Sequence, residues 1–210
     1  PLTISVSTFV KMFFTPFESE VWAKIKAPSL GMTETEVLEM WRKKSKNAAI
    51  LGTELHAEIE SYLESKTVKS QKPEFKQFIS LYNKKLNKLT PYRSEWRIFD
   101  DKSRLAGTTD MVFQKPDGSF AIYDWKRAKE IKKDNRYSRG LGPCSYLPDC
   151  NYIHYSLQIN TYKHILQAQY GISISEMNIT QLHPNQSEFK LYHVQDLSEY
   201  VEKMIHFLAE

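Results

Sequence analysis

The sequence predicts an α/β or α+β fold in which one central mixed β-sheet is flanked by helices. In the first third of the chain, apolar residues recur at helical spacing. The middle instead holds short runs rich in aromatic and β-branched residues, which are typical of strands, and one more helix and a strand pair follow. With 210 residues, 41% of them hydrophobic, we expect one domain covering 1–210.

The part from 1 to 90 is expected to be mainly helical. A short helix near the start has Ser7 or Thr8 as its candidate cap. Thr33 and Glu36 have the spacing of a capping box, which predicts that a longer helix begins there. The predicted helices of this part lie within residues 5–14, 33–46, 48–63 and 73–89.

The part from 91 to 193 is expected to form the sheet core with one long helix, and the part from 194 to 210 a C-terminal helix. Residues 114–118 have the composition of a hairpin turn, so we expect the first three strands to be adjacent and antiparallel. Asp196 or Ser198 is the candidate cap of the last helix. The predicted strands span residues 94–99, 104–113, 119–126, 176–182 and 189–193, and the predicted helices residues 152–170 and 196–208.

Positive charge is concentrated in one stretch. The whole chain has 29 Lys+Arg against 25 Asp+Glu, a net charge of +4 that indicates little by itself. Residues 126–139, however, contain seven basic and two acidic residues, which favours binding of an anionic polymer. The alternative is an ordinary solvated loop, although a tyrosine among arginines is compatible with stacking on unpaired bases. The candidate substrate-binding residues are Arg127, Lys129, Arg136, Tyr137 and Arg139.

Composition excludes several classes of protein. Cys144 and Cys150 are the only cysteines, which argues against a disulfide scaffold and against a four-cysteine metal site within this chain. The reducing interior of a cell is therefore the expected location, and the sequence does not indicate which compartment of the cell it is. No stretch is apolar enough to cross a membrane, and no secretory signal is visible. Because the chain starts at Pro1, we expect it to be part of a longer polypeptide.

The residues with the clearest chemical potential lie on the second and third predicted strands. Asp124 and Lys126 are two apart, so they share one face of a strand while Trp125 points to the other. Hairpin pairing brings Asp110 close to Asp124, and two adjacent carboxylates repel unless a cation lies between them. Oxygen ligands favour Mg²⁺, or Mn²⁺ if an imidazole joins them. For these three residues alone, a structural salt bridge at the strand ends is the commoner explanation.

A larger pattern surrounds them. The chain contains, in order, G-T-E-L-H-A-E-I-E, S-E-W-R-I-F, L-A-G-T-T-D-M-V-F, A-I-Y-D-W-K-R-A-K and Q-I-N-T-Y. This order resembles the RecB-like branch of the PD-(D/E)xK nuclease superfamily, from about residue 52 to residue 170. That branch includes bacterial recombination nucleases, CRISPR-associated adaptation nucleases and a mitochondrial single-strand exonuclease. The resemblance implies a restriction-endonuclease-like core with an N-terminal helical region.

The resemblance also implies roles for individual residues. Asp110 and Asp124 match the two carboxylate ligands of the metal, and the backbone carbonyl of Trp125 matches an additional oxygen ligand. Lys126 matches the catalytic lysine, which orients the attacking water and holds a phosphate oxygen. His56 matches the helix histidine that completes the metal site. Taken alone, His56 would more often be a surface histidine or a satisfied core histidine.

Four further residues are candidates. Gln158 and Tyr162 match the Q-x-x-x-Y element, which is thought to position substrate, although they could be an ordinary half-buried pair on one helix face. Glu95, given lower weight, occupies the place of a glutamate that the family often has one strand earlier. Glu60, also of lower weight, lies one turn after His56 and either hydrogen-bonds a ligand or faces solvent.

The cofactor implied is Mg²⁺ or Mn²⁺ without an iron–sulfur cluster. Several relatives hold such a cluster through four cysteines, one before and three after the active site. Here both cysteines follow Lys126. We therefore expect no cluster in this protein.

The expected function is cleavage of DNA, as an exonuclease or flap-trimming enzyme on single-stranded ends, within a larger replication or recombination assembly. One alternative is an RNA endonuclease of the cap-snatching type, which uses a similar set of His, acidic and Lys residues; the Q-x-x-x-Y element argues against it. Another is a non-catalytic nucleic-acid-binding module of a larger helicase or recombination assembly. That module would bind nucleic acid without turnover.

Overall fold

The computed structural model describes residues 3–67 and 70–209. Its strands are β1 (Ile4–Ser5), β2 (Thr90–Asp100), β3 (Leu105–Gln114), β4 (Phe120–Lys126), β5 (Ile174–Gln181) and β6 (Lys190–His193). Its α-helices are α1 (Val6–Lys11), α2 (Ser19–Leu30), α3 (Glu34–Ser65), α4 (Pro73–Lys84), α5 (Asn151–Tyr170) and α6 (Ser198–Ala209). Two 3₁₀ turns span Leu86–Lys88 and Gly142–Cys144.

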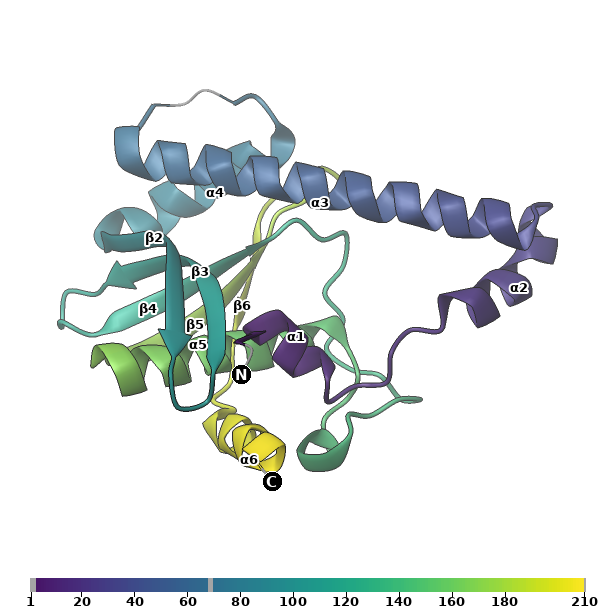
Figure 1. Ribbon diagram of the computed structural model, residues 1–210. Coiled ribbons are helices and arrows are strands. Elements are labelled where there is room, and N and C mark those ends of the chain that lie inside the picture. The colour runs from purple at the N-terminus through teal and green to yellow at the C-terminus, as the bar shows by residue number, and fades with distance from the viewer. Residues whose placement is uncertain (1–2, 68–69, 210) are drawn as a thin grey trace.

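The strands form a six-stranded mixed sheet with helices on both faces, as the sequence predicts (Figure 1). Strands β1, β3, β4, β5 and β6 pair with one another in that order. Strand β3 also pairs along its length with β2. The β1/β3 and β4/β5 pairs are parallel, whereas β2/β3, β3/β4 and β5/β6 are antiparallel. The predicted antiparallel arrangement of the first three long strands is confirmed. Gly118, with a φ of +84°, closes the predicted turn between β3 and β4.

Side-chain alternation gives the sheet two hydrophobic faces. Val112 and Ile122 pack with α1, α5 and α6 on one face. Phe113 and Trp125 pack with α3 and α4 on the other. The site described below lies where α3 and α5 approach the sheet from these opposite sides.

The N-terminal helical part contains one long helix where two shorter helices were predicted. One 32-residue helix, α3, replaces the two predicted helices, and Thr33 begins it with the predicted capping box to Glu36. Gly52 lies inside this helix, where it costs about 1 kcal/mol relative to alanine. Burial of Leu55 and Ile59 against the sheet offsets that cost, because each is 1% exposed.

Other boundaries at the N-terminus were predicted wrongly or not at all. Ser5 caps α1 by accepting a hydrogen bond from the backbone of Thr8, so neither Ser7 nor Thr8 is the cap. The short strand β1 and the helix α2 were not predicted. Helix α2 packs on α3 mainly through small residues, Ala23 and Ala27, which produce little amphipathic signal in a sequence.

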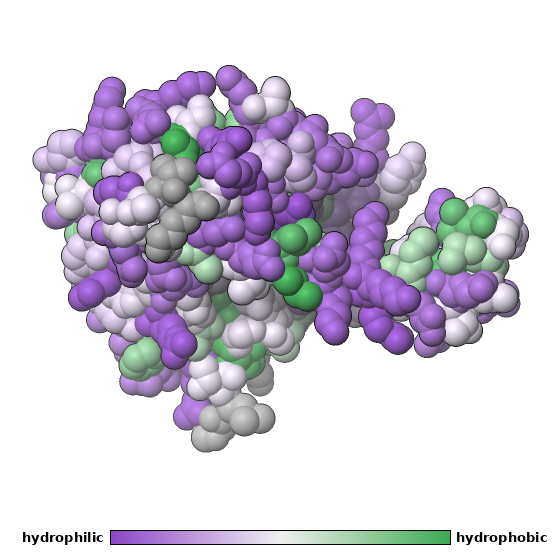
Figure 2. All heavy atoms as spheres, turned by 90° about the horizontal axis from the view of Figure 1, so that it is seen from above, coloured by the Kyte–Doolittle hydropathy of each residue, from purple (hydrophilic) through white to green (hydrophobic). Residues whose placement is uncertain are grey.

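Helix α2 and the start of α3 project from the rest of the molecule (Figure 1). Seen from above, most atoms belong to hydrophilic residues, and hydrophobic atoms gather at the end of this projection (Figure 2). The exposed apolar residues there include Val21, Ile25 and Leu30 of α2. No helix among the described residues is both long and apolar enough to span a bilayer.

Candidate metal centre

Asp110 lies where strands β3 and β4 stop pairing with each other. Their ladder ends at the pair Met111 and Tyr123. Beyond it, the Asp110 side chain continues the ladder, because Asp110 Oδ2 accepts a hydrogen bond from the backbone N–H of Trp125 at 2.7 Å. Strand β4 instead remains paired with β5 as far as Lys126. At the point where the strands diverge, the Asp110 side chain therefore takes the place of a backbone partner for Trp125.

Asp124 and Lys126 share one face of β4, as the alternation predicts. Lys126 Nζ donates to Asp124 Oδ1 at 3.0 Å. Asp124 Oδ2 also lies 2.8 Å from this nitrogen, but it lacks hydrogen-bond geometry and has no other hydrogen-bond partner among the described residues. The side chain of Asp124 is only 3% exposed. A buried carboxylate oxygen without a hydrogen bond is costly unless a cation binds it.

His56 reaches this site from α3, 69 residues away in the chain. Its Nε2 lies 2.9 Å from the carbonyl oxygen of Trp125. If Nε2 donates to that carbonyl, Nδ1 faces the carboxylates of Glu95 and Asp110, from which it lies 3.5 Å and 3.6 Å away. The helix histidine and the strand carboxylates thus converge from different elements.

Glu95 of β2 belongs to this cluster. One ligand atom each from His56, Glu95 and Asp110 lies within 4.8 Å of the other two. Glu95 has a φ of +43°, in the left-handed region that residues other than glycine rarely adopt. Such backbone strain costs on the order of 1–3 kcal/mol and is concentrated at functional sites. Glu95, a candidate of lower weight from the sequence alone, is thus one of the three residues whose ligand atoms converge.

The electrostatics of the site favour a bound cation. Burial and the charge of Asp124 raise the pKa of Asp110 to about 7. Burial lowers the pKa of His56, but the hydrogen bond with Glu95 and the charge of Asp110 outweigh it and raise the pKa to about 9. Carboxylate oxygens with one imidazole suit Mg²⁺ or Mn²⁺. The donor set therefore fits a hard divalent cation, and Asp124 Oδ2, which is ion-paired with Lys126 but has no hydrogen-bond partner among the described residues, is one of its candidate oxygen ligands.

Helix α5 lines the site from the opposite face of the sheet. Gln158 Nε2 donates to the Tyr162 hydroxyl at 2.7 Å, so this predicted pair forms. Tyr162 packs against Gly107 of β3, where an added Cβ would lie 2.5 Å from Tyr162 Cε1. The ring of Tyr155 lies 4.7 Å from Lys126 Nζ, in a cation–π contact. Tyr155 was missed by the sequence analysis; its only signal was its position one turn before Gln158.

The other candidate residues form no hydrogen bond or ion pair with His56, Asp110 or Asp124 in the described part of the chain. Glu60 accepts a hydrogen bond from Ser94 Oγ at 3.2 Å, so it links α3 to β2 next to Glu95. Arg127 does not project into solvent, because its Nε lies 2.8 Å from Oε1 of the buried Glu74. The remaining candidates in the basic stretch are exposed: Lys129, Arg136, Tyr137 and Arg139.

Comparisons with known proteins leave the family open. No family model and no curated protein matches the chain. The fold is similar to that in the crystal structure of SSO0001, with 14% identity and a TM-score of 0.38 over 99% of this chain and 76% of that one. It is also similar to a Eubacterium rectale protein named "Putative exonuclease", with 12% identity and a TM-score of 0.40 over 97% of this chain and 76% of that one. Neither likeness is near enough to say what this chain does.

Proposed function

We propose that this chain is a divalent-metal-dependent nuclease that hydrolyses phosphodiester bonds of DNA, as an exonuclease or flap-trimming enzyme on single-stranded ends. The observation that carries the proposal is the convergence of His56, Glu95 and Asp110, whose ligand atoms lie within 4.8 Å of one another. Beside them, Lys126 is paired with the buried Asp124. We further propose that residues 1–210 form one nuclease domain, since β1 pairs with β3 of the central sheet.

In this proposal, His56, Glu95, Asp110 and Asp124 hold Mg²⁺ or Mn²⁺. The carbonyl of Trp125 has a second lone pair beyond its contact with His56, and it is an additional candidate ligand. A bound cation of this kind acidifies water and stabilises charge on the phosphate. The chain has the donors that such a cation needs without any cysteine ligand.

Lys126 acts as a fixed positive charge. Burial alone lowers the pKa of this lysine, but the charges of Asp124 and Asp110 raise it above its ordinary value. Lys126 therefore stays protonated and is suited to holding a phosphate oxygen. It is not suited to accepting a proton from water at neutral pH.

The proposal is tested with end-labelled linear single-stranded DNA in Mn²⁺, Mg²⁺ and EDTA. We expect the label to be released only with metal, and Asp124→Asn to lower the rate by at least about 100-fold. Glu199→Gln is the matched control, because that carboxylate is exposed and pairs with Lys203 in α6. Cleavage that persists in EDTA or in Asp124→Asn contradicts the proposed site. Closed circular DNA and RNA of the same sequence, run in parallel, test the preference for ends and for DNA.

Metal binding is expected to strengthen as the pH rises. A cation must displace protons from Asp110, with its pKa near 7, and from His56, with its pKa near 9. Each displaced proton makes affinity rise roughly tenfold per pH unit below the pKa of its group. Calorimetric titration of Mn²⁺ between about pH 6 and pH 9, in buffers of different ionisation enthalpy, measures both affinity and proton release. A constant affinity with no proton release contradicts this assignment of ligands.

Tyr155 is expected to position Lys126 through its ring and not through its hydroxyl. A desolvated cation–π contact contributes on the order of 1–2 kcal/mol. Tyr155→Leu should therefore lower kcat roughly 5- to 30-fold with little change in KM, whereas Tyr155→Phe should retain most of the wild-type kcat. Steady-state kinetics of the two variants checks this, since equal losses in both would assign the effect to the hydroxyl.

A further inference from the structure

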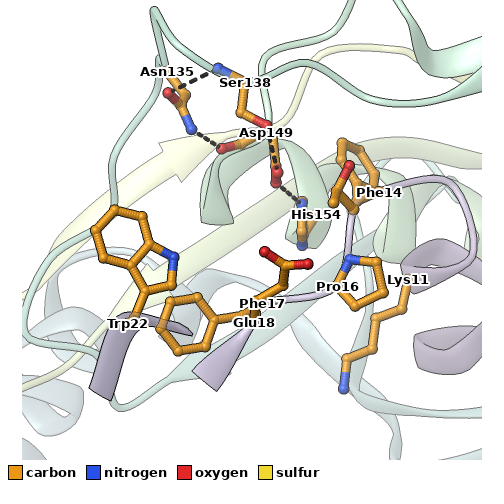
Figure 3. Close-up of a pocket in the computed structure, with 11 residues that line it drawn as sticks. Lys11, Phe14, Pro16, Phe17, Glu18, Trp22, Asn135, Ser138, Asp149 and His154 are labelled. Atoms are coloured by element: carbon orange, nitrogen blue, oxygen red, sulfur yellow. Dashed lines mark hydrogen bonds and ion pairs between the residues drawn. The ribbon is translucent and has the colours of Figure 1, made fainter. Parts of the chain in front are cut away.

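An open cavity lies outside the metal centre, between the segment that follows α1 and the loop that leads into α5 (Figure 3). Its volume is about 860 Å³, within the range of ligand sites, which is about 300–1,000 Å³. The residues that matter for its chemistry are Phe17, Glu18, Trp22, Asn135, Asp149 and His154. The proposed function has not used any of them.

One side of the cavity presents exposed aromatic rings. Phe17 is 68% exposed and Trp22 is 45% exposed. Their rings are nearly parallel, with an interplanar angle of 7° and centroids 6.5 Å apart. Trp41 of α3 also contacts Phe17, at 6.0 Å between ring centroids. Exposed, supported rings of this kind are stacking surfaces for unpaired bases, since every base has a π-face.

The opposite side is polar and held in place by its own hydrogen bonds. Asp149 Oδ1 lies 2.8 Å from His154 Nε2, and Asp149 Oδ2 accepts from Ser138 Oγ at 3.0 Å. Asn135 Nδ2 donates to the Asp149 carbonyl at 2.7 Å. The His154 ring also packs on Phe14, with centroids 4.0 Å apart. These contacts preorganise the wall that faces the aromatic rings.

Charge decides which part of a nucleotide fits. The Glu18 carboxylate lies between the rings and the polar wall in Figure 3 and has no ion pair within residues 3–67 and 70–209. With Asp149 opposite, it makes the interior of the cavity unfavourable for phosphate. Cations lie around the cavity: Lys11 is one of its lining residues, and the exposed Lys132 and Arg136 line a neighbouring pocket that shares Asn135 and Asp149 with it. A base inside and phosphates outside satisfy both sets of charges.

We propose that this cavity binds one unpaired nucleobase of the strand that the metal centre cuts, stacked on Trp22 and Phe17 with an amino-bearing edge toward Glu18. Carboxylates accept hydrogen bonds from the exocyclic amino group of cytosine, which thymine lacks. Occupancy by the substrate strand rests on the proposed nuclease function. Helix α5 connects the two sites, because His154 lines the cavity and the next residue, Tyr155, contacts Lys126 beside the metal centre.

The test is fluorescence anisotropy of labelled 12-nucleotide oligo-dC and oligo-dT in EDTA, where no metal-dependent cleavage occurs. We expect oligo-dC to bind more tightly than oligo-dT, and Trp22→Ala to weaken binding of oligo-dC about 5- to 150-fold, as expected for the loss of one stacked base. Trp22→Phe should bind nearly as well as wild type. Phe99→Ala is the matched control, because Phe99 is a comparably exposed aromatic residue, 54% exposed against 45% for Trp22, on β2 outside the cavity.

Glu18→Gln tests separately whether the Glu18 carboxylate contacts the amino-bearing edge of the base. This variant should reduce the preference for oligo-dC over oligo-dT. Equal affinity of wild type and Trp22→Ala overturns the cavity proposal, even if the wild type cleaves DNA. A wild type that is inert in Mn²⁺ but binds oligonucleotides through Trp22 overturns the proposed nuclease function instead and supports the cavity as a base-binding site.

Discussion

Replacing Lys126 with methionine is expected to lower the rate of DNA cleavage by about 10²- to 10³-fold, the typical effect of removing one group that stabilises transition-state charge. Lys126 Nζ lies 2.8 Å from Asp124 Oδ2, beside the proposed metal ligands. Methionine keeps an unbranched side chain that is one heavy atom shorter, and it removes the charge together with the hydrogen bond to Asp124. The loss should therefore fall on kcat, which single-turnover cleavage in Mn²⁺ measures directly.

Folding and metal binding provide the control for Lys126→Met. Removing the lysine leaves Asp124 buried without its partner, so some loss of thermal stability is expected. Excess Mn²⁺ should restore part of that stability, because a cation at the site neutralises the same carboxylate. Cleavage at the wild-type rate by a folded, metal-bound Lys126→Met protein would remove Lys126 from the active site.

Replacing Arg127 with alanine is expected to destabilise the fold by roughly 3–5 kcal/mol, the typical cost of removing one partner of a buried ion pair. The Arg127 and Glu74 side chains are only 12% and 5% exposed, and they join the end of β4 to α4. Alanine at position 127 would leave the Glu74 carboxylate buried without its cation. Chemical denaturation at neutral pH measures the loss.

The pH dependence of this effect follows from Glu74. Burial raises the pKa of this carboxyl, but a backbone hydrogen bond and the contact with Arg127 outweigh burial and hold it below its ordinary value. The pair therefore contributes stability at neutral pH, which is lost as the pH falls through the lowered pKa. The difference between wild type and Arg127→Ala should shrink toward acid pH.

Lys129→Ala is the matched control in the same basic stretch. Lys129 is exposed, so its removal should change stability by no more than about 0.5 kcal/mol. If Arg127→Ala is as stable as Lys129→Ala but binds DNA more weakly, Arg127 contacts the strand and not the core.

Adjacent residues of the basic stretch thus have different roles. Lys126 and Arg127 follow one another, yet the first pairs with Asp124 beside the metal centre and the second with Glu74 of α4. Composition identified both as cations near a candidate site. Only the backbone direction at the end of β4 assigns one to the site and the other to the core.

The sequence by itself determined the features that depend on near neighbours along the chain. Alternation in β4 places Asp124 and Lys126 on one face because successive side chains in a strand point to opposite sides. Thr33 and Glu36 form their capping box because both partners lie within one turn. The helical spacing of Gln158 and Tyr162 likewise brings their side chains together.

Tertiary structure decided what depends on distant segments. Glu95 joins the cluster because β2 lies beside β3, and its positive φ occurs between Ser94 and Trp96, which both pair with β3. His56 contacts Trp125, and the Tyr155 ring contacts Lys126, only because α3 and α5 pack on opposite faces of one sheet. Side-chain burial across the sheet sets these distances, and local spacing contains no information about them.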